Sequence, residues 1–196
     1  MRIAVDLDGV LADTMVSVCQ ILNSRRTTPL TVESFDRWRA WEIAGITRDE
    51  FFATLDEAWF SWETLPSTED ELDAKVGSLG RFGTVDIVTG RSSATVPQAN
   101  SWLKHYKIPF DSFVRTDNST VAKLDLHYDL YIDDSSELMT LLASKLHGLG
   151  VLYLRPWNRN TLEMPRILKV DRWDQIPHAI EQGRFLRSKV AATDTT

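Results

Sequence analysis

The fold can be inferred from the first thirteen residues, Met1-Arg-Ile-Ala-Val-Asp-Leu-Asp-Gly-Val-Leu-Ala-Asp13. Its apolar residues 3–5 are typical of a buried strand, and they are followed by Asp6-Leu-Asp8-Gly9. Ligands of open α/β sheets bind beyond the carboxyl ends of the strands. Two carboxylates at such a place need a proton or a cation between them. Mg²⁺, a hard cation that prefers oxygen ligands, suits the position.

Two later apolar segments also end in polar side chains. Residues 85–88 precede Thr89-Gly90-Arg91, and residues 130–132 precede Asp133-Asp134. Segments with a helical spacing of apolar residues separate these strands. The alternation predicts an α/β fold with a doubly wound parallel sheet, in which the carboxyl ends of the strands share one edge. We therefore expect these polar residues to lie close to the acids that follow the first strand.

Capping signals and apolar spacing predict the remaining elements. Thr47-Arg-Asp-Glu50 and Thr68-Glu-Asp-Glu71 both fit the pattern of a capping box, and Ser92 or Ser93 can cap a later helix. Gly148 and Gly150 are expected to end the helix that begins near residue 138. The predicted helices cover about residues 12–24, Val32–Ala40, 47–59, 72–79, 92–106, 138–146 and 173–187, and the further strands cover Phe113–Arg115, 151–154 and Ile167–Val170.

Residues 25–66 differ from the rest of the chain in their aromatic content. They hold four of the seven tryptophans and four of the eight phenylalanines: Phe35, Trp38, Trp41, Phe51, Phe52, Trp59, Phe60 and Trp62. A small helical insertion needs large side chains to build a core, which explains this density without a ligand. The alternative is that some of the rings stack on a flat ligand such as a nucleobase. We expect a core domain of residues 1–24 and 67–190, and an insertion of residues 25–66.

Composition excludes several classes of function. The net charge of −6 disfavours a nucleic-acid groove, which requires clustered Lys and Arg. Cys19 is the only cysteine, so a disulfide framework and a cysteine-based zinc site are excluded. No apolar run approaches the ~20 residues that span a bilayer, and a strand that starts at residue 2 leaves no room for a signal peptide. The expectations are a cytoplasmic protein, no membrane partner and a disordered tail at residues 191–196.

The expected cluster of side chains suits phosphoryl transfer. One carboxylate of the first pair can attack phosphorus, and the other can protonate the leaving alcohol and later activate water. The Thr89 hydroxyl and the Lys123 ammonium group can stabilise the charge of the phosphoryl oxygens. Lys123 comes ten residues before Asp133, which would place it near the acids. A Mg²⁺ ion would neutralise the acids themselves.

These four groups of residues resemble, in the same order, the motifs of the haloacid dehalogenase (HAD) superfamily. The resemblance implies a Rossmann-like sheet with a small helical cap at residues 25–66. It implies Asp6 as the nucleophile, Asp8 as the general acid and base that also binds Mg²⁺, and Asp134 as a further ligand. Asp133 would support that site or replace Asp134 as ligand. The phosphate binders implied by the resemblance are Thr89, Gly90 and Lys123.

The chain is most similar to the 5′(3′)-deoxyribonucleotidases of that superfamily. The similarity rests on residues 9–13, the aromatic cap before Leu65-Pro66, Asp129-Leu-Tyr-Ile-Asp-Asp134 and Arg172-Trp173-Asp174. It implies a phosphomonoesterase that hydrolyses nucleoside monophosphates, with deoxyribonucleotides preferred. Cap aromatics would then contact the base, and the candidates are Phe51, Phe52, Trp59, Phe60 and Trp62.

The chain departs from this family after two of its motifs. Thr89 is followed by Gly90-Arg91 where the family often has Ser or Ala, and Asp134 is followed by Ser135-Ser136 where a basic residue is common. A preference for pyrimidine deoxynucleotides is therefore not carried over. Arg91 could contact phosphate, although an exposed loop arginine is the simpler interpretation.

Two alternative functions remain open at this point. One is a HAD phosphatase of a sugar phosphate or another small metabolite. The other is a non-catalytic scaffold protein that has the same fold and binds a ligand. The expected partner is a small phosphorylated substrate, with a nucleotide favoured, and a homodimer is left open.

Overall fold

Six strands, all parallel, form one sheet in the order β3-β2-β1-β4-β5-β6. The computed structural model describes residues 1–117, 120–145 and 148–183. The strands are β1 (Arg2–Val5), β2 (Thr84–Thr89), β3 (Ser112–Arg115), β4 (Leu130–Asp133), β5 (Leu149–Tyr153) and β6 (Ile167–Val170). The chain runs outward from β1 to β3 on one side and from β4 to β6 on the other. The predicted fold class is confirmed, and the strand order reverses between β1 and β4, where ligands of such sheets bind.

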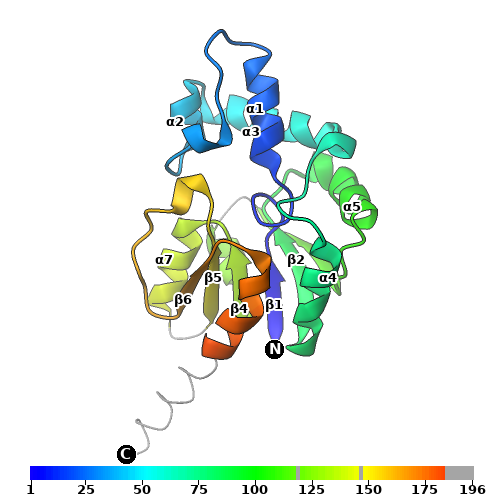
Figure 1. Ribbon diagram of the computed structural model, residues 1–196, viewed down its shortest axis with the longest axis vertical. Helices are drawn as coiled ribbons and strands as arrows, with labels where there is room; N and C mark the ends of the chain where they lie inside the picture. Colours follow the sequence, from blue (N-terminus) through cyan, green and yellow to red (C-terminus); the bar gives the residue numbers. More distant parts are fainter. Residues whose placement is uncertain (118–119, 146–147, 184–196) are drawn as a thin grey trace, which may run out of the picture.

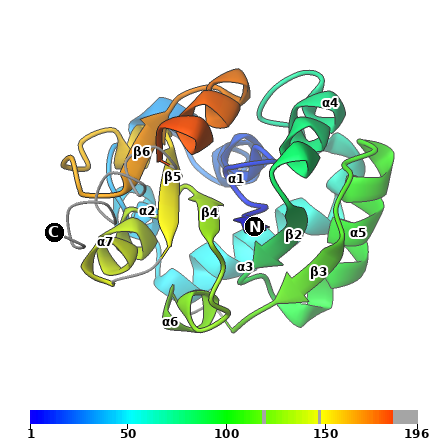
Figure 2. The same ribbon diagram turned by 90° about the horizontal axis from the view of Figure 1, so that it is seen from below.

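Helices cover both faces of the sheet (Figure 2). The α-helices are α1 (Thr14–Asn23), α2 (Ala40–Ala44), α3 (Arg48–Phe60), α4 (Leu72–Gly77), α5 (Val96–His105), α6 (Thr120–Leu124) and α7 (Ser136–Ser144). The short 3-10 helices are η1 (Val32–Ser34), η2 (Trp62–Thr64), η3 (Ser78–Arg81), η4 (Ser93–Thr95), η5 (Pro156–Asn158) and η6 (Trp173–Gln175), and residues 176–183 continue as a helix. Within the described residues, no helix is long and apolar enough to cross a membrane.

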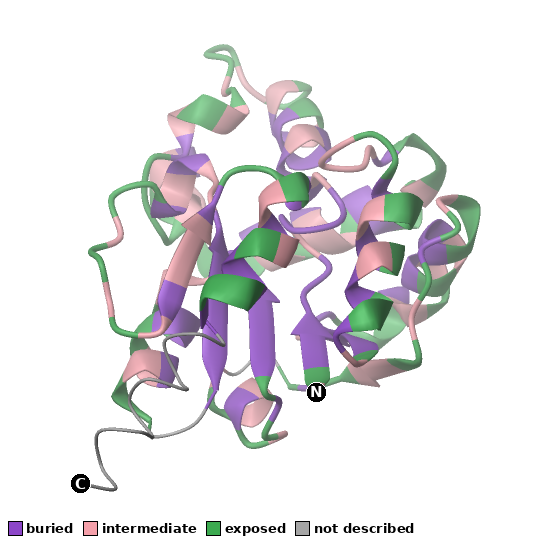
Figure 3. Cartoon of the chain, turned by 60° about the horizontal axis from the view of Figure 1, so that its bottom comes forward, coloured by how far each residue is buried: buried purple, intermediate pink, exposed green. Residues whose placement is uncertain are grey.

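Alternation along the strands divides the core into two halves. Ile3 and Val5 of β1 pack into the half beneath α4, α5 and residues 176–183, whereas Ala4 packs into the half beneath α6 and α7. Successive side chains of a strand point to opposite faces, which explains why a strand buried on both sides is a continuous apolar run. Figure 3 shows the central strands as buried, the outer strands β3 and β6 as less buried, and the helices as exposed on their outer sides.

Helices α1, α2 and α3 form a separate layer above the carboxyl edge of the sheet (Figure 1). The capping box predicted at Thr47 is confirmed, because its Oγ1 accepts the Glu50 N–H at 3.2 Å and Glu50 accepts the Thr47 N–H at 2.8 Å. Helix α1 packs against α3 in this layer. The division of the chain at residue 24 stays a prediction, although α1 lies with the helices of the insertion.

The helix predicted over Val32–Ala40 is wrong. The structure has one 3-10 turn, η1, followed by irregular chain and then by α2, which begins after Arg39 in the left-handed region at φ 73°. The Phe35 side chain is fully buried in the core and the chain leaves the helical conformation at this residue. A short isolated helix is only marginally stable, so the burial of one aromatic ring outweighs it.

Two further details of the predicted elements are wrong. Thr68 does not cap a helix, because its hydroxyl donates to the carbonyl of Val10 at 2.7 Å and α4 begins only after Glu71. Gly150 does not end a helix but pairs with Tyr131 inside the sheet. Tertiary contacts decide both cases. The expected tail at residues 191–196 and the end of the last predicted helix lie outside the described residues.

Gly150 gives a test of the packing between β5 and α7. A Cβ at this position would lie 2.5 Å from Sδ of Met139 and 2.6 Å from Cδ1 of Ile167. Overpacking of this kind costs about 1–3 kcal/mol, so Gly150→Ala should lower the free energy of unfolding in urea by that amount. Gly80→Ala is the control, because a Cβ there meets no atom within 4 Å. Equal losses in both variants would contradict the packing described here.

Candidate active site

Three buried carboxylates meet where β1 lies beside β4. Asp6 follows β1, and Asp133 and Asp134 lie at the end of β4. The Asp6 N–H donates to the carbonyl of Ile132 at 2.9 Å and so holds the two chain segments side by side. One oxygen from each of the three carboxylates lies within 4.8 Å of the others. Such an all-oxygen set suits a hard divalent cation.

Lys123 of α6 lies among these acids. Its Nζ is 2.9 Å from Oδ1 of Asp6 and 2.8 Å from Oδ2 of Asp133. Three carboxylates against one ammonium group leave an excess of negative charge. Burial, with Asp133 and Asp8 nearby, raises the pKa of Asp6 although Lys123 opposes this. Burial together with Asp133 and Asp6 also raises the pKa of Asp134.

The two adjacent acids of β4 are held differently. Oδ1 of Asp133 accepts the Ser135 N–H at 2.8 Å, and its Oδ2 accepts Lys123, so both of its oxygens are engaged. Oδ2 of Asp134 accepts Nε1 of Trp157 at 3.0 Å, and Nδ2 of Asn158 donates to the Asp134 carbonyl at 2.8 Å. Within the described residues, Oδ1 of Asp134 accepts no hydrogen bond.

Gly9 allows the chain to turn directly over these acids. Its φ is 75°, and a Cβ there would lie 2.2 Å from Oδ2 of Asp134. Only glycine adopts the left-handed conformation without strain and also leaves this space. Gly9 is therefore required at this position, because the backbone lies directly against the carboxylate of Asp134.

Asp8 is held by two donors from different parts of the chain. Nε1 of Trp59 and Nη1 of Arg91 donate to the same oxygen, Oδ1, at 2.8 and 2.7 Å. Nη2 of Arg91 also donates to Asp56 at 3.1 Å, and its Nε donates to Thr95 at 3.1 Å. The expectation that Arg91 lies exposed on a loop is wrong, because it is buried between these partners.

Thr89 and Gly90 lie at the end of β2, next to the acids in the wall of one cavity. The Thr89 side chain is buried, and its Oγ1 accepts the Arg91 N–H at 3.3 Å. Its carbonyl accepts the Thr116 N–H at 2.9 Å. The hydroxyl therefore has a fixed place at the carboxyl edge of the sheet.

A cavity of about 500 Å³ lies between the acids and the upper layer of helices. Its floor is formed by the polar residues described above. Its apolar wall comes from the upper layer and consists of Met15, Trp38, Trp41, Phe51, Phe52 and Leu55. Arginines also line it, namely Arg37, Arg39, Arg91 and Arg115. A volume of this size suits a small organic molecule with one polar and one apolar end.

Of the five aromatic residues expected to contact the base, two line this cavity, namely Phe51 and Phe52. Their rings pack edge to face at 6.1 Å, and Trp41 lies 6.2 Å from the first and 6.4 Å from the second. Trp38, which is 41% exposed, completes this side. The four rings form an aromatic wall opposite the carboxylates.

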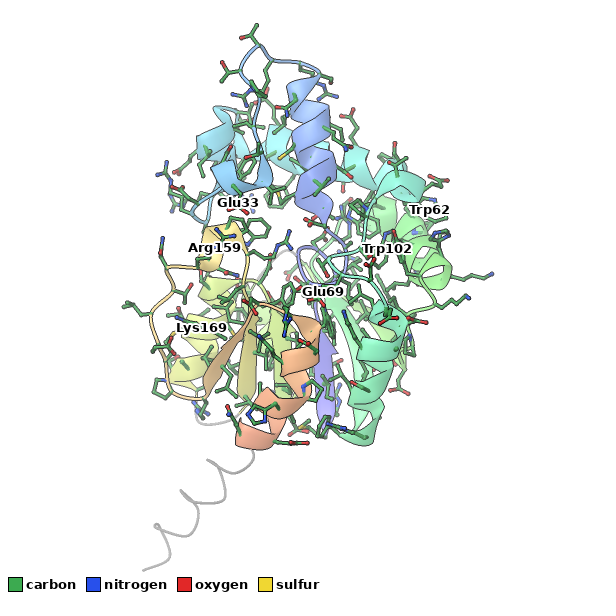
Figure 4. All side chains as sticks on the ribbon, in the orientation of Figure 1. Glu33, Trp62, Glu69, Trp102, Arg159 and Lys169 are labelled. Atoms are coloured by element: carbon green, nitrogen blue, oxygen red, sulfur yellow. The ribbon has the colours of Figure 1, made fainter. Side chains whose placement is uncertain are left out.

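The other three candidates do not line the cavity. Trp59 is fully buried and donates to Asp8, and Phe60 is 56% exposed on the outside of α3. Trp62 packs against His105 with ring centres 5.9 Å apart, on the flank beside α5 (Figure 4). The helical repeat of α3 directs Trp59 and Phe60 away from the cavity, and Trp62 lies beyond this helix in η2.

Several residues of the cavity were not singled out from the sequence. Trp38 and Trp41 were counted in the aromatic segment, but the sequence predicts a helix over Val32–Ala40 where the structure has irregular chain around Trp38. Arg39 in its left-handed conformation has no sequence signal. Trp157 follows Arg155-Pro156 after β5, and the position of this turn at the end of a strand is the one clue that could have revealed it.

Solved structures share this fold at low sequence identity. A phosphatase predicted in Clostridium acetobutylicum has a TM-score of 0.61 and 18% identity, over 92% of this chain and 98% of that one. A HAD-superfamily hydrolase of subfamily IA from Geobacter sulfurreducens has a TM-score of 0.56 and 15% identity, over 90% and 97%. YfnB from Bacillus subtilis, solved with bound magnesium, has a TM-score of 0.56 and 15% identity, over 90% and 96%.

Comparison with curated proteins gives no match. A family model does match, and it covers residues 1–187, which is nearly the whole chain and includes every residue of the site. The family is described as 5′ nucleotidase, deoxy (pyrimidine), cytosolic type C protein. The chain therefore belongs to this family of 5′-nucleotidases and is a phosphoric monoester hydrolase with the HAD fold.

Proposed function

We propose that this protein is a Mg²⁺-dependent phosphatase of nucleoside monophosphates, with deoxyribonucleotides preferred, and that it acts through an aspartyl-phosphate on Asp6. One observation carries the proposal: the buried set of Asp6, Asp133, Asp134 and Lys123 lies across a cavity from an aromatic wall. The acids suit the phosphate end of a nucleotide, and the rings suit its base. Family membership supports the same class of substrate.

Asp6 would attack phosphorus. A bond forms between a carboxylate oxygen of Asp6 and phosphorus as the bond from phosphorus to the leaving oxygen breaks. Lys123 has three N–H donors and uses two on Asp6 and Asp133, so the third is available to a phosphoryl oxygen. Oγ1 of Thr89 accepts the Arg91 N–H, which leaves its own hydrogen free to be donated to a phosphoryl oxygen.

Asp8 would carry the proton in both steps. Its protonated carboxyl gives the proton to the leaving alkoxide while Asp6 becomes phosphorylated. Its carboxylate then takes a proton from the water that attacks the phosphorus atom. The second step releases inorganic phosphate and restores Asp6.

The carboxylate set fits a Mg²⁺ ion. Asp6, Asp134 and the backbone carbonyl of Asp8 would hold it, and Asp133 would keep Lys123 in place, because both oxygens of Asp133 already accept hydrogen bonds. When bound, the ion neutralises the acids and polarises the phosphoryl group. We place the reaction in the cytoplasm, in keeping with the cytosolic type in the description of the family.

Replacement of the nucleophile tests the mechanism. Asp6→Asn keeps the size of the side chain but removes its negative charge, so phosphate release from deoxynucleoside monophosphates with Mg²⁺ should fall by at least about 10³-fold. Asp73→Asn is the control, since Asp73 is exposed on α4. Retention of more than a tenth of the wild-type rate in Asp6→Asn would rule out the aspartyl-phosphate.

Metal binding is tested by thermal stability, without any turnover. At about 100 times its Kd, an ion that binds only the folded protein stabilises it by about 2.7 kcal/mol, so the midpoint of unfolding should rise in a Mg²⁺ titration. Asp134→Asn should abolish the rise, whereas Asp133→Asn should keep most of it. The assignment of Asp134 as the ligand is wrong if the two variants show the opposite order.

Removal of cavity rings tests the base site. Stacking on one ring contributes ~1–3 kcal/mol, so Phe52→Ala and Trp38→Ala should each lower kcat/KM for a nucleotide by about 5- to 150-fold. The same variants should leave p-nitrophenyl phosphate hydrolysis within about twofold. Trp62→Ala is the matched control, because Trp62 does not line the cavity. Equal losses on both substrates would favour a metabolite phosphatase without base recognition.

A further inference from the structure

The side chain of Arg91 has no part in the mechanism above, yet it is among the most buried charged side chains at the cavity. Its side chain is 4% exposed. It lies two residues after the end of β2 and reaches Asp8 after β1, while Asp56 and Trp59 both come from α3. Its guanidinium carbon lies 4.7 Å from the centre of the Trp59 ring. One side chain thus joins the sheet, the upper layer and Asp8.

The contacts distinguish the two oxygens of Asp8. Arg91 and Trp59 both donate to Oδ1, so this oxygen acts as an acceptor. Within the part of the chain that the structure describes, Oδ2 accepts no hydrogen bond, and Asp8 lines the cavity. A proton on Asp8 therefore belongs on Oδ2, the oxygen to which no donor of the described residues is bound.

We propose that Arg91 is a positioning residue that fixes Asp8 with Oδ2 toward the substrate. Because Arg91 also binds Asp56, this orientation of Asp8 depends on the position of α3. The inference rests on the proposed role of Asp8 as acid and base. Arg91 then acts through Asp8 and not on the phosphoryl group itself.

Charge and geometry argue against a phosphate-binding role for Arg91. Its single positive charge faces two carboxylates, those of Asp8 and Asp56, so no positive charge is left over for an anion. Each of its three guanidinium nitrogens also donates to a protein oxygen, the third of them in Thr95. The planar guanidinium group has N–H donors in fixed directions and can bind two carboxylates at once. The ammonium group of a lysine is less suited to this.

The consequence is a dependence on the leaving group. A basic alkoxide needs a proton in order to leave, whereas a weakly basic nitrophenolate leaves without one. Misplacement of the acid therefore slows the loss of an alkoxide far more than the loss of a nitrophenolate. In addition, kcat/KM reports on the steps up to the phosphoenzyme and is unaffected by the hydrolysis of that intermediate. The slope of log kcat/KM against leaving-group pKa therefore measures how well Asp8 is positioned.

The experiment compares full-length variants on a series of aryl and alkyl phosphates with Mg²⁺. For Arg91→Gln we expect kcat/KM to fall by about 10²- to 10⁴-fold on the alkyl phosphates and by less than about tenfold on p-nitrophenyl phosphate. Arg91→Lys and Asp56→Asn should steepen the slope in the same direction, and by less. On an Asp8→Asn background, Arg91→Gln should produce no further change of slope.

Arg159→Gln is the matched control. Arg159 forms a bidentate ion pair with Glu33 at 2.8 and 3.1 Å, which joins the chain after η5 to η1 (Figure 4). Neither residue lines the cavity. This variant should keep the wild-type slope. If Arg91→Gln fails to fold, as judged by circular dichroism, Asp56→Asn and Arg91→Lys decide the question.

Three results would overturn the inference. These are equal losses across the series, an effect confined to KM, or a wild-type slope in both Asp56→Asn and Arg91→Lys. Failure of the proposed function has a different signature, because it would appear as an inactive wild-type protein or as an active Asp6→Asn variant, whatever the slope in the Arg91 variants.

Discussion

The structure depends on the close approach of three carboxylates, two of which share one lysine. Asp6, Asp133 and Asp134 would repel each other in a buried space, and burial strengthens this repulsion. Lys123 neutralises part of the negative charge, and the negative charge that remains suits a cation. The parallel pairing of β1 with β4 brings the acids together. The switch in strand order between these strands therefore determines the position of the site as well as the fold.

Other contacts around the acids hold them in their positions. Gly9 leaves room for Asp134, and Trp157 and Asn158 hold that residue from the turn after β5. Trp157 thereby restricts the carboxylate of Asp134, and Asn158 restricts its backbone. A site that must hold like charges in fixed positions needs such support from several elements.

The upper layer of helices gives the site its second half. It closes the cavity with aromatic side chains and contributes Asp56 and Trp59 to the group around Asp8. The same helices thus line the cavity and contact Asp8 and Arg91 at its floor.

Local patterns alone determined the strands, their polar ends and most of the helices. The run Ile3-Ala-Val5 has to be a strand buried on both faces, and acids directly after it have to lie at the sheet edge. The capping box at Thr47 is equally local, since both of its bonds lie within one turn. Residues that follow the strand ends could therefore be named from the sequence, because chain connectivity fixes where they lie.

Only the tertiary structure decided which aromatic rings face the cavity and what Arg91 does. Trp59 and Phe52 lie on the same helix, but one is buried against Asp8 and the other lines the cavity. Arg91 contacts residues 83 and 35 positions away in the sequence. The irregular chain after Phe35 depends in the same way on the burial of one ring. Such outcomes follow from contacts between distant segments, which no local pattern of residues records.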